Sequence, residues 1–263
     1  MAAFQQQFGN QGRKSKVSCV RGYLHESIIL AGGKGERLKS VISHTPKPMA
    51  NVAGKPFLEW LILALKKQGI RNVILSTGYL SELIEHYFGD GKHFGMEILY
   101  CVNPYPLGTG GAIRNALNLI KSNCFLVLNG DSFCDFDLEQ FYNFHLEKKS
   151  HASILLTEVK DSGRFGSVII SDNGEVLSFR EKTAINEKGL INAGVYILEK
   201  ASLESAPQNQ AISLEKEIFP ALIGKGLYAI VNKSIFCDIG TPESYNDSCK
   251  LLTDKFKSME TEV

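Results

Sequence analysis

Short apolar runs alternate with amphipathic stretches along the first half of the chain. Four of the apolar runs have the length and composition of buried strands, at residues 27–31, 72–76, 96–102 and 124–128. The stretches between them repeat apolar residues at helical spacing and predict helices over 57–69, 81–88, 110–121 and 137–148. Ser81 and Asp137 are the candidate N-caps. This alternation predicts an α/β fold, with a Rossmann-like, mostly parallel mixed sheet and helices on both faces.

The second half of the chain is richer in strands. The pattern predicts strands over 151–159, 166–170, 191–198, 226–231 and 234–237, and a helix over about 213–223. Asn173-Gly174 predicts a hairpin turn, and Thr241-Pro242 predicts the start of a terminal helix. Because no repeat or linker interrupts the pattern, residues 27–263 are expected to form one domain. Residues 1–26 are rich in Gln, Gly and basic residues and predict a leader or poorly ordered extension without a secretory signal.

The charge balance argues against two classes of partner. The chain has 29 Lys and Arg against 28 Asp and Glu, a formal charge of +1. We therefore expect no nucleic-acid partner and no attraction to an anionic membrane. No apolar run approaches the roughly 20 residues of a membrane helix. The six cysteines show no C-x-x-C spacing and lie mostly in apolar runs, which predicts reduced thiols and a cytoplasmic location.

A glycine-rich, basic loop follows the first predicted strand. Gly32, Gly33 and Gly35 leave the backbone bare at the carboxyl end of the strand, where open α/β sheets bind ligands. Such a loop can cradle phosphate, although a simple turn is an equal alternative from these residues alone. The chain has no P-loop motif, and Leu38 stands where a dinucleotide loop has its third glycine. No H-E-x-x-H or paired Cys/His cluster predicts zinc. Lys47 lies between two prolines, in a phosphate-binding or a surface position.

Six motifs in a fixed order extend this picture over most of the chain. They are Leu30-Ala31-Gly32-Gly33-x-Gly35-x-Arg37-Leu38 with Lys47 ten residues after Arg37, Pro106-Leu107-Gly108-Thr109-Gly110-Gly111-Ala112, Asn129-Gly130-Asp131, Phe179-Arg180-Glu181-Lys182, Ile191-Asn192-Ala193-Gly194 and Asp238-Ile239-Gly240-Thr241-Pro242. From residue 27 to about 255, the chain resembles the sugar nucleotidylyltransferases, also called NDP-sugar pyrophosphorylases. The segment 106–113 is most similar to D-glycero-D-manno-heptose 1-phosphate guanylyltransferases, and mannose-1-phosphate guanylyltransferases are also similar.

The resemblance implies a reaction between an NTP, with GTP favoured, and a sugar 1-phosphate, with D-glycero-D-manno-heptose 1-phosphate favoured. The products are pyrophosphate and an NDP-sugar for surface-glycan synthesis. The attacking phosphate monoester has a second pKa of about 6, so it is anionic at neutral pH and needs no general base. Catalysis then depends on positioning and on cations. The resemblance also implies Mg²⁺ as cofactor, a homodimer as one oligomeric state, and a nucleotide-diphospho-sugar transferase fold without a β-helix extension.

The resemblance also implies roles for individual residues. Arg37 and Lys47 are the expected catalytic cations, and Asp131 and Asp238 are the expected metal ligands, with turn and cap roles as the alternatives. The expected nucleotide-binding residues are Leu30, Ala31, Gly32, Gly33, Gly35, Asn103, Gly108, Thr109 and Asn129. The expected sugar-phosphate-binding residues are Gly166, Glu181, Lys182 and Asn192. The family usually has Glu or Gln where Asn103 stands and Pro where Thr183 stands, so the base contact and one turn differ.

Two other classes of function, a non-catalytic sensor and a glycosyltransferase, are alternatives to a nucleotidyltransferase. A non-catalytic sensor of NDP-sugars would be expected to have lost Arg37, Lys47 or a metal-binding aspartate, yet all are present. A glycosyltransferase would use a D-x-D motif, which Asp135-Phe136-Asp137 matches literally. That motif lies past Asn129-Gly130-Asp131, and a glycosyltransferase would leave the Lys47 loop unexplained. The sequence therefore favours the nucleotidyltransferase.

Overall fold

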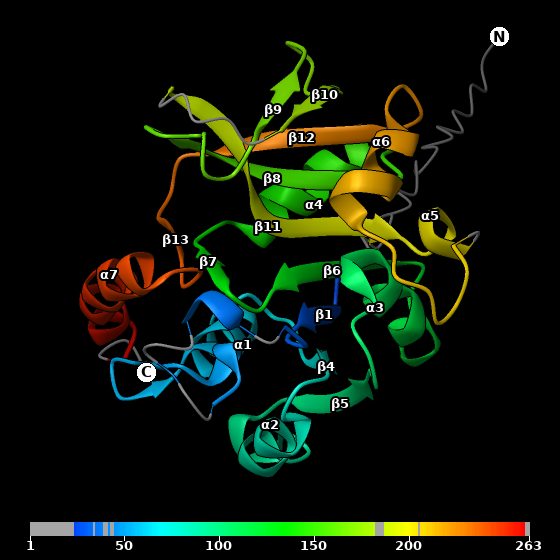
Figure 1. Cartoon of the computed structure of the whole chain (residues 1–263). Coiled ribbons are helices and arrows are strands. Elements are labelled where there is room, and N and C mark those ends of the chain that lie inside the picture. The colour runs from blue at the N-terminus through cyan, green and yellow to red at the C-terminus, as the bar shows by residue number, and fades with distance from the viewer. Residues whose placement is uncertain are drawn as a thin grey trace, which may run out of the picture.

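A seven-stranded sheet forms the centre of the computed structural model. The structure describes residues 24–33, 35–38, 42, 45–181, 187–204 and 206–260, the last five of them by backbone alone. The strand order of the sheet is β12-β8-β11-β6-β1-β4-β5, which Figure 1 shows from top to bottom. The strands are β1 (Glu26–Leu30), β4 (Asn72–Thr77), β5 (Glu97–Val102), β6 (Cys124–Asn129), β8 (Ala152–Val159), β11 (Gly189–Glu199) and β12 (Leu227–Asn232). Only β11 pairs antiparallel with its neighbours in this sheet, so the predicted mixed, mostly parallel sheet is confirmed.

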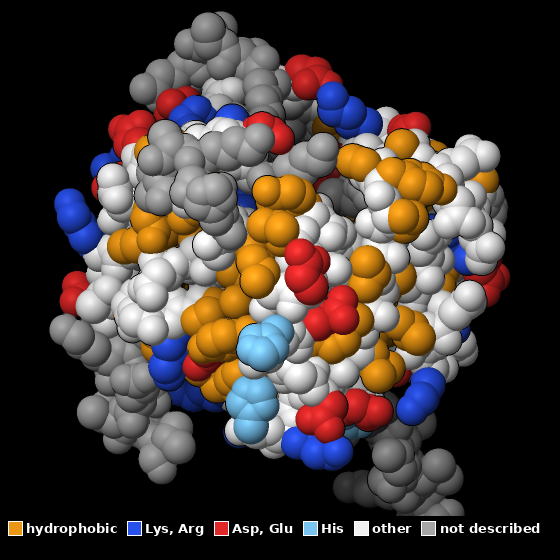
Figure 2. Space-filling view, turned by 60° about the horizontal axis from the view of Figure 1, so that its bottom comes forward, with side chains coloured by type: hydrophobic (Ala, Val, Ile, Leu, Met, Phe, Trp, Pro, Cys, Tyr) orange, Lys and Arg blue, Asp and Glu red, His pale blue; other side chains and the backbone are white. Residues whose placement is uncertain are grey.

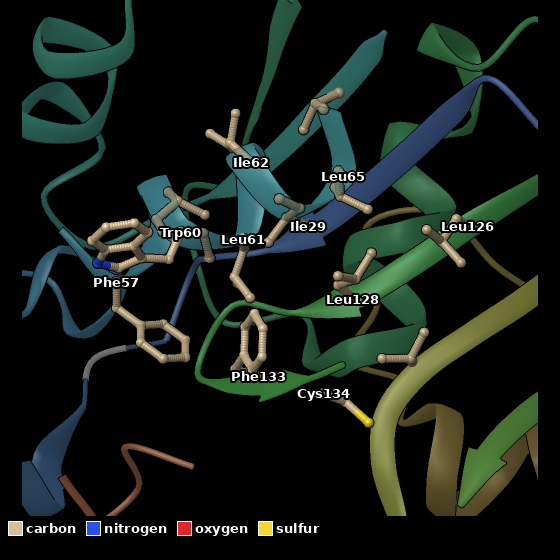
Figure 3. Close-up of a cluster of buried hydrophobic side chains, with 14 of the residues drawn as sticks. Ile29, Phe57, Trp60, Leu61, Ile62, Leu65, Leu126, Leu128, Phe133 and Cys134 are labelled. Atoms are coloured by element: carbon tan, nitrogen blue, oxygen red, sulfur yellow. The ribbon is translucent and has the colours of Figure 1, made fainter. Parts of the chain in front are cut away.

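Helices cover both faces of the sheet because successive strand residues point to opposite sides. The helices are α1 (Phe57–Lys67), α2 (Ser81–Phe88), α3 (Gly108–Ala116), α4 (Leu138–Glu147), α5 (Ala201–Glu204), α6 (Phe219–Leu222) and α7 (Pro242–Glu260). Buried side chains of α1, α2, α4 and α7 share one apolar cluster with Ile29, and Figure 3 shows the part around α1 and β6. Those of α3, α5 and α6 share a second cluster with Ile28.

Three two-stranded sheets lie outside the central one. They pair β2 (Asn51–Val52) with β3 (Lys55–Pro56), β7 (Ser132–Cys134) with β13 (Phe236–Asp238), and β9 (Ser167–Ile170) with β10 (Val176–Arg180). The β9–β10 hairpin turns through Asn173-Gly174, as predicted. The β7–β13 pairing matters most for function, because it joins the chain after β6 to the chain before α7. Figure 1 shows α7 beside these two strands.

Several predicted boundaries are wrong by one or more residues. Strand β1 begins at Glu26, and Leu24 is buried in the core, so the fold reaches into the stretch assigned to the extension. Residues 1–23 of the extension predicted over 1–26 lie outside the described residues. Ser81 does not cap α2, because Leu80 is the N-cap, in a left-handed conformation. Helix α3 begins at Gly108, whereas Asp137 caps α4 by accepting a hydrogen bond from the Gln140 N–H at 2.9 Å.

The predicted helix over 213–223 is two shorter elements. A π-helix spans Leu214–Ile218 and α6 follows it directly. Pro220 has no N–H to continue an α-helical ladder back to Lys216, and both the Glu217 and Ile218 N–H groups donate to Ser213 O at 3.2 Å. The spacing of apolar residues therefore indicates a helix over this segment, but Pro220 and the wider turn of the π-helix divide it in two.

The surface agrees with the balanced charge of the chain. In the view of Figure 2, apolar, acidic and basic side chains are intermingled, and neither sign of charge dominates the face. Among the described residues, no helix combines the length and the apolar character needed to cross a membrane.

Candidate active site

A cavity of about 550 Å³ opens at the carboxyl ends of β1, β4 and β6. These strands are adjacent and parallel, so the loops that follow them leave the sheet at the same edge. Of the predicted nucleotide-binding residues, seven line the cavity: Leu30, Gly32, Gly33, Asn103, Gly108, Thr109 and Asn129. Lys47 and Asp131 line it as well. The cavity thus brings together residues that are up to 101 positions apart, from Leu30 to Asp131.

Lys47 contacts one of the two aspartates that the sequence assigns to metal binding and lies near the other. Its side chain is 10% exposed, and Nζ donates to Asp131 Oδ2 at 2.5 Å. Nζ also lies 3.9 Å from the point where a Cβ would stand on Gly240, and that point is 2.6 Å from Asp238 Oδ1. The structure therefore brings Lys47, Asp131 and Asp238 close together at the sheet edge. The two flanking prolines and a 3-10 turn over Lys47–Met49 hold the lysine there.

The β7–β13 pairing fixes the two aspartates. Asp131 O accepts a hydrogen bond from the Ile239 N–H at 2.9 Å, and Asp238 is in register with Ser132. Asp238 Oδ1 accepts from the Gly240 N–H at 2.7 Å and from Ser244 Oγ at 3.0 Å, at the start of α7. The aspartate thus has the predicted cap-like contacts, and its carboxylate is oriented by them. Two carboxylates at one edge supply the oxygen donors that Mg²⁺ prefers, with phosphate and water completing its shell.

The glycine loop packs against the lysine. Gly35 has φ +62°, and a Cβ there would lie 2.9 Å from Lys47 Cβ, so only glycine fits both the backbone and the contact. Arg37 follows in a 3-10 turn over Glu36–Leu38, where Arg37 is exposed and Leu38 is buried. Arg37, Gly35 and the buried Ala31 do not line the cavity, but their loop lies beside it. An exposed guanidinium on a loop beside the cavity is available to phosphate oxygens that project from it.

Asn103 has its carboxamide committed to the protein. Nδ2 donates to Ser76 Oγ at 3.0 Å and to Thr77 O at 3.3 Å, and Oδ1 accepts from Asn115 Nδ2 at 3.3 Å. Asn129 differs, because its buried Oδ1 has no hydrogen-bond partner among the described residues. A buried, unpaired acceptor at a cavity wall is costly and fits a ligand hydroxyl or amino group. Of the two asparagines, Asn129 is therefore the one whose side-chain oxygen has no partner within the part of the chain that the structure describes.

The predicted sugar-phosphate residues lie away from this cavity. Glu181 is exposed at the end of β10, and Gly166 precedes β9 with φ +80°. Asn192 lies in β11, where Nδ2 donates to Tyr196 OH at 2.8 Å and Oδ1 accepts from the Gly194 N–H at 2.8 Å. Lys182 lies outside the described residues. These assignments stay predictions.

Comparison with known proteins decides the family. A model of the nucleotidyl transferase family matches residues 26–255. The chain belongs to the nucleotidyl transferase family.

Relatives of this nucleotidyltransferase match it over most of its own length, and some of them are longer than this chain. The chain is 40% identical to D-glycero-alpha-D-manno-heptose 1-phosphate guanylyltransferase of Aneurinibacillus thermoaerophilus, covering 86% of this chain and 98% of the relative. It is 38% identical to mannose-1-phosphate guanylyltransferase of Mycobacterium tuberculosis, covering 84% of this chain and 62% of that protein. A crystal structure of HddC from Yersinia pseudotuberculosis superimposes with a TM-score of 0.78 and 38% identity, over 87% of this chain and 100% of that one. HddC was also solved in complex with GMP-PN.

Three residues at or beside the cavity were not predicted from the sequence, namely Tyr79, Tyr105 and Glu215. Tyr79 and Tyr105 line the cavity and are 40% and 49% exposed, so two aromatic side chains are accessible there to a ligand. Tyr79 follows the end of β4 and Tyr105 the end of β5, and this position after a parallel strand could have identified both tyrosines from the sequence. Glu215 contacts the hydroxyl of Thr109 at 2.8 Å from 106 positions away, and no local pattern indicates that contact.

Proposed function

We propose that this nucleotidyltransferase transfers GMP from GTP to a sugar 1-phosphate, with D-glycero-D-manno-heptose 1-phosphate as the preferred acceptor. The observation that carries the proposal is the convergence of Lys47, Asp131 and Asp238 beside a cavity large enough for a nucleotide. The heptose and guanine preferences rest on the relatives, whose names state those substrates. The product would serve surface-glycan synthesis. The five described cysteines are free thiols, which supports work in the reducing cytoplasm.

The chain needs no general base for this reaction. A sugar 1-phosphate oxygen, already anionic at neutral pH, attacks the α-phosphorus of GTP in line, and the bond to the β-phosphate oxygen breaks as pyrophosphate leaves. Lys47 neutralises the α-phosphate region, and Arg37 holds the departing pyrophosphate with its bidentate fork. When Mg²⁺ is bound, it supplies charge neutralisation, and Asp131 and Asp238 would hold it.

The second substrate is assigned to the other side of the metal-binding pair. Glu181 and Asn192 would accept and donate hydrogen bonds with sugar hydroxyls, Lys182 would neutralise the sugar phosphate, and Gly166 would leave room for the ring. Strand β13, which ends at Asp238, is linked to this side of the molecule, because its Phe236 contacts Phe165 at a ring distance of 6.0 Å. This contact supports placing the 165–166 turn next to the reaction centre.

A substrate matrix tests the proposal. Purified protein with Mg²⁺ is incubated with each of four NTPs and with heptose, mannose or glucose 1-phosphate, and released pyrophosphate is measured. We expect the highest kcat/KM for GTP with D-glycero-alpha-D-manno-heptose 1-phosphate. A preference for mannose 1-phosphate would assign the activity of the mycobacterial relative instead. Absence of pyrophosphate with every pair would refute nucleotidyl transfer.

A further inference from the structure

A segment at 210–215 closes the amino end of α3, the helix that follows the cavity-lining loop. The Ile212 N–H donates to Leu107 O at 2.9 Å, and Ile212 O accepts from the Gly110 and Gly111 N–H groups at 2.9 and 3.1 Å. These are N–H groups that the first turn of a helix leaves without partners. Because Ile212 O occupies them, the amino end of α3 is bonded to this segment.

Glu215 lies at the end of that segment and gathers three hydroxyl groups. Oε2 accepts from Thr109 Oγ1 at 2.8 Å and from Ser213 Oγ at 3.0 Å, and Oε1 accepts from Tyr196 OH at 3.1 Å. Glu215 belongs to the π-helix Leu214–Ile218, a rare geometry that is frequent at functional sites. Only a carboxylate can accept from both sides without offering a proton in return.

Tyr196 carries the connection into β11. Its side chain is fully buried, and burial together with the charge of Glu215 raises the pKa of Tyr196 well above its ordinary value, so the hydroxyl keeps its proton. That proton goes to Glu215, and the tyrosine oxygen accepts from Asn192 Nδ2 at 2.8 Å. The pairing of β11 with β8 shifts register between Asn192 and Tyr196, an irregularity typical of strands beside active sites.

The contacts form one continuous chain, Thr109–Glu215–Tyr196–Asn192. Thr109 lines the cavity assigned to the nucleotide, and Asn192 is assigned to the sugar. We infer that Glu215 is a positioning residue that couples nucleotide binding to sugar 1-phosphate binding through Tyr196. The inference rests on the proposed function. A shift of the Thr109 loop on nucleotide binding is transmitted to the Asn192 carboxamide, since each hydroxyl in the chain has its proton direction set by Glu215.

Two variants test the coupling. Glu215→Gln places an N–H donor opposite hydroxyls that already donate, so one or more of those hydroxyls must turn. Tyr196→Phe removes the hydroxyl that joins Glu215 to Asn192, together with its contact to Asn129, and keeps the contact between Glu215 and Thr109. Glu217→Gln is the matched control, because Glu217 lies in the same π-helix and is exposed. Its one donor among the described residues is the Ser213 N–H, from which an amide oxygen can also accept.

The measurement is calorimetric binding of the preferred sugar 1-phosphate, with and without α,β-methylene GTP, whose bridge cannot be cleaved. For the wild type and for Glu217→Gln we expect the analogue to tighten sugar-phosphate binding at least about fivefold. For Glu215→Gln and Tyr196→Phe we expect this ratio to fall towards one, while the analogue alone binds Tyr196→Phe as it binds the wild type.

The outcomes separate this inference from the proposed function. Wild-type turnover with GTP and the sugar 1-phosphate reports on the function alone. If the wild type turns over but shows no tightening, or if Tyr196→Phe retains it, the coupling role of Glu215 is overturned. If Glu215→Gln does not fold, Tyr196→Phe alone decides. If the wild type neither turns over nor binds any sugar 1-phosphate, the proposed function itself is wrong.

Discussion

Replacing Gly108 by alanine should destabilise the protein through its contact with the 210–215 segment. Gly108 has φ +66°, and a Cβ built there lies 2.5 Å from Ile212 O. The left-handed backbone costs a non-glycine residue about 1–2 kcal/mol. The clash forces a backbone carbonyl to move and costs a further 1–3 kcal/mol or so, as overpacking does. Ile212 O cannot move freely, because it also accepts from Gly110 and Gly111.

The expected loss of unfolding free energy is therefore about 2–5 kcal/mol. Urea unfolding followed by the fluorescence of Trp60, the single tryptophan, measures it. The midpoint should fall with an unchanged m-value, and the melting temperature should fall by about 2–4 °C per kcal/mol.

Two control variants separate the cost of the left-handed backbone from the cost of the clash with Ile212 O. Gly54→Ala tests the backbone alone, since Gly54 has φ +86° and nothing within 4 Å of the added Cβ. Gly33→Ala has neither a positive φ nor a neighbour within 4 Å and should be close to neutral. If Gly108→Ala costs no more than Gly54→Ala, the close packing of the segment on α3 is refuted.

Three further predictions test other parts of the structure. Asp238→Asn should keep the Gly240 and Ser244 contacts and the fold, but its turnover should fall by several orders of magnitude, as should that of the wild type after chelation. The control Asp90→Asn, at an exposed carboxylate, should leave turnover unchanged. Turnover that survives thorough chelation would contradict the metal role. Arg37→Lys should lower kcat with a smaller change in KM, because lysine lacks the bidentate fork; a rise in the KM for GTP alone would make Arg37 a ground-state contact. Burial lowers the pKa of His145 to about 4. Below about pH 6.5 the unfolded chain therefore binds a proton at this histidine that the folded protein does not bind. About 3 kcal/mol of the free energy of unfolding should be lost between pH 6.5 and 4. His145→Gln should flatten that part of the stability profile, and an identical slope in both proteins would show that His145 is not the group responsible.

The order of strands and helices is readable from local patterns. The period of apolar residues locates β1, β4, β6 and α1 to within a few residues, because burial of one face acts on each element separately. The motifs likewise point to the sheet edge at which the cavity lies, since loops after parallel strands gather there. Lys47, Asp131 and the loop at 108–109 were all predicted at the site, and the structure places them around the same cavity.

Tertiary structure alone decides which of those residues touch. Lys47 meets Asp131 across 84 positions and Thr109 meets Glu215 across 106, and neither periodicity nor spacing encodes a contact at such range. The β7–β13 pairing that aligns Asp238, and the partners that occupy the Asn103 carboxamide, depend on packing between distant elements. Local sequence specifies what each segment buries, whereas the hydrogen-bond partner of a polar side chain is chosen only when segments from different parts of the chain meet.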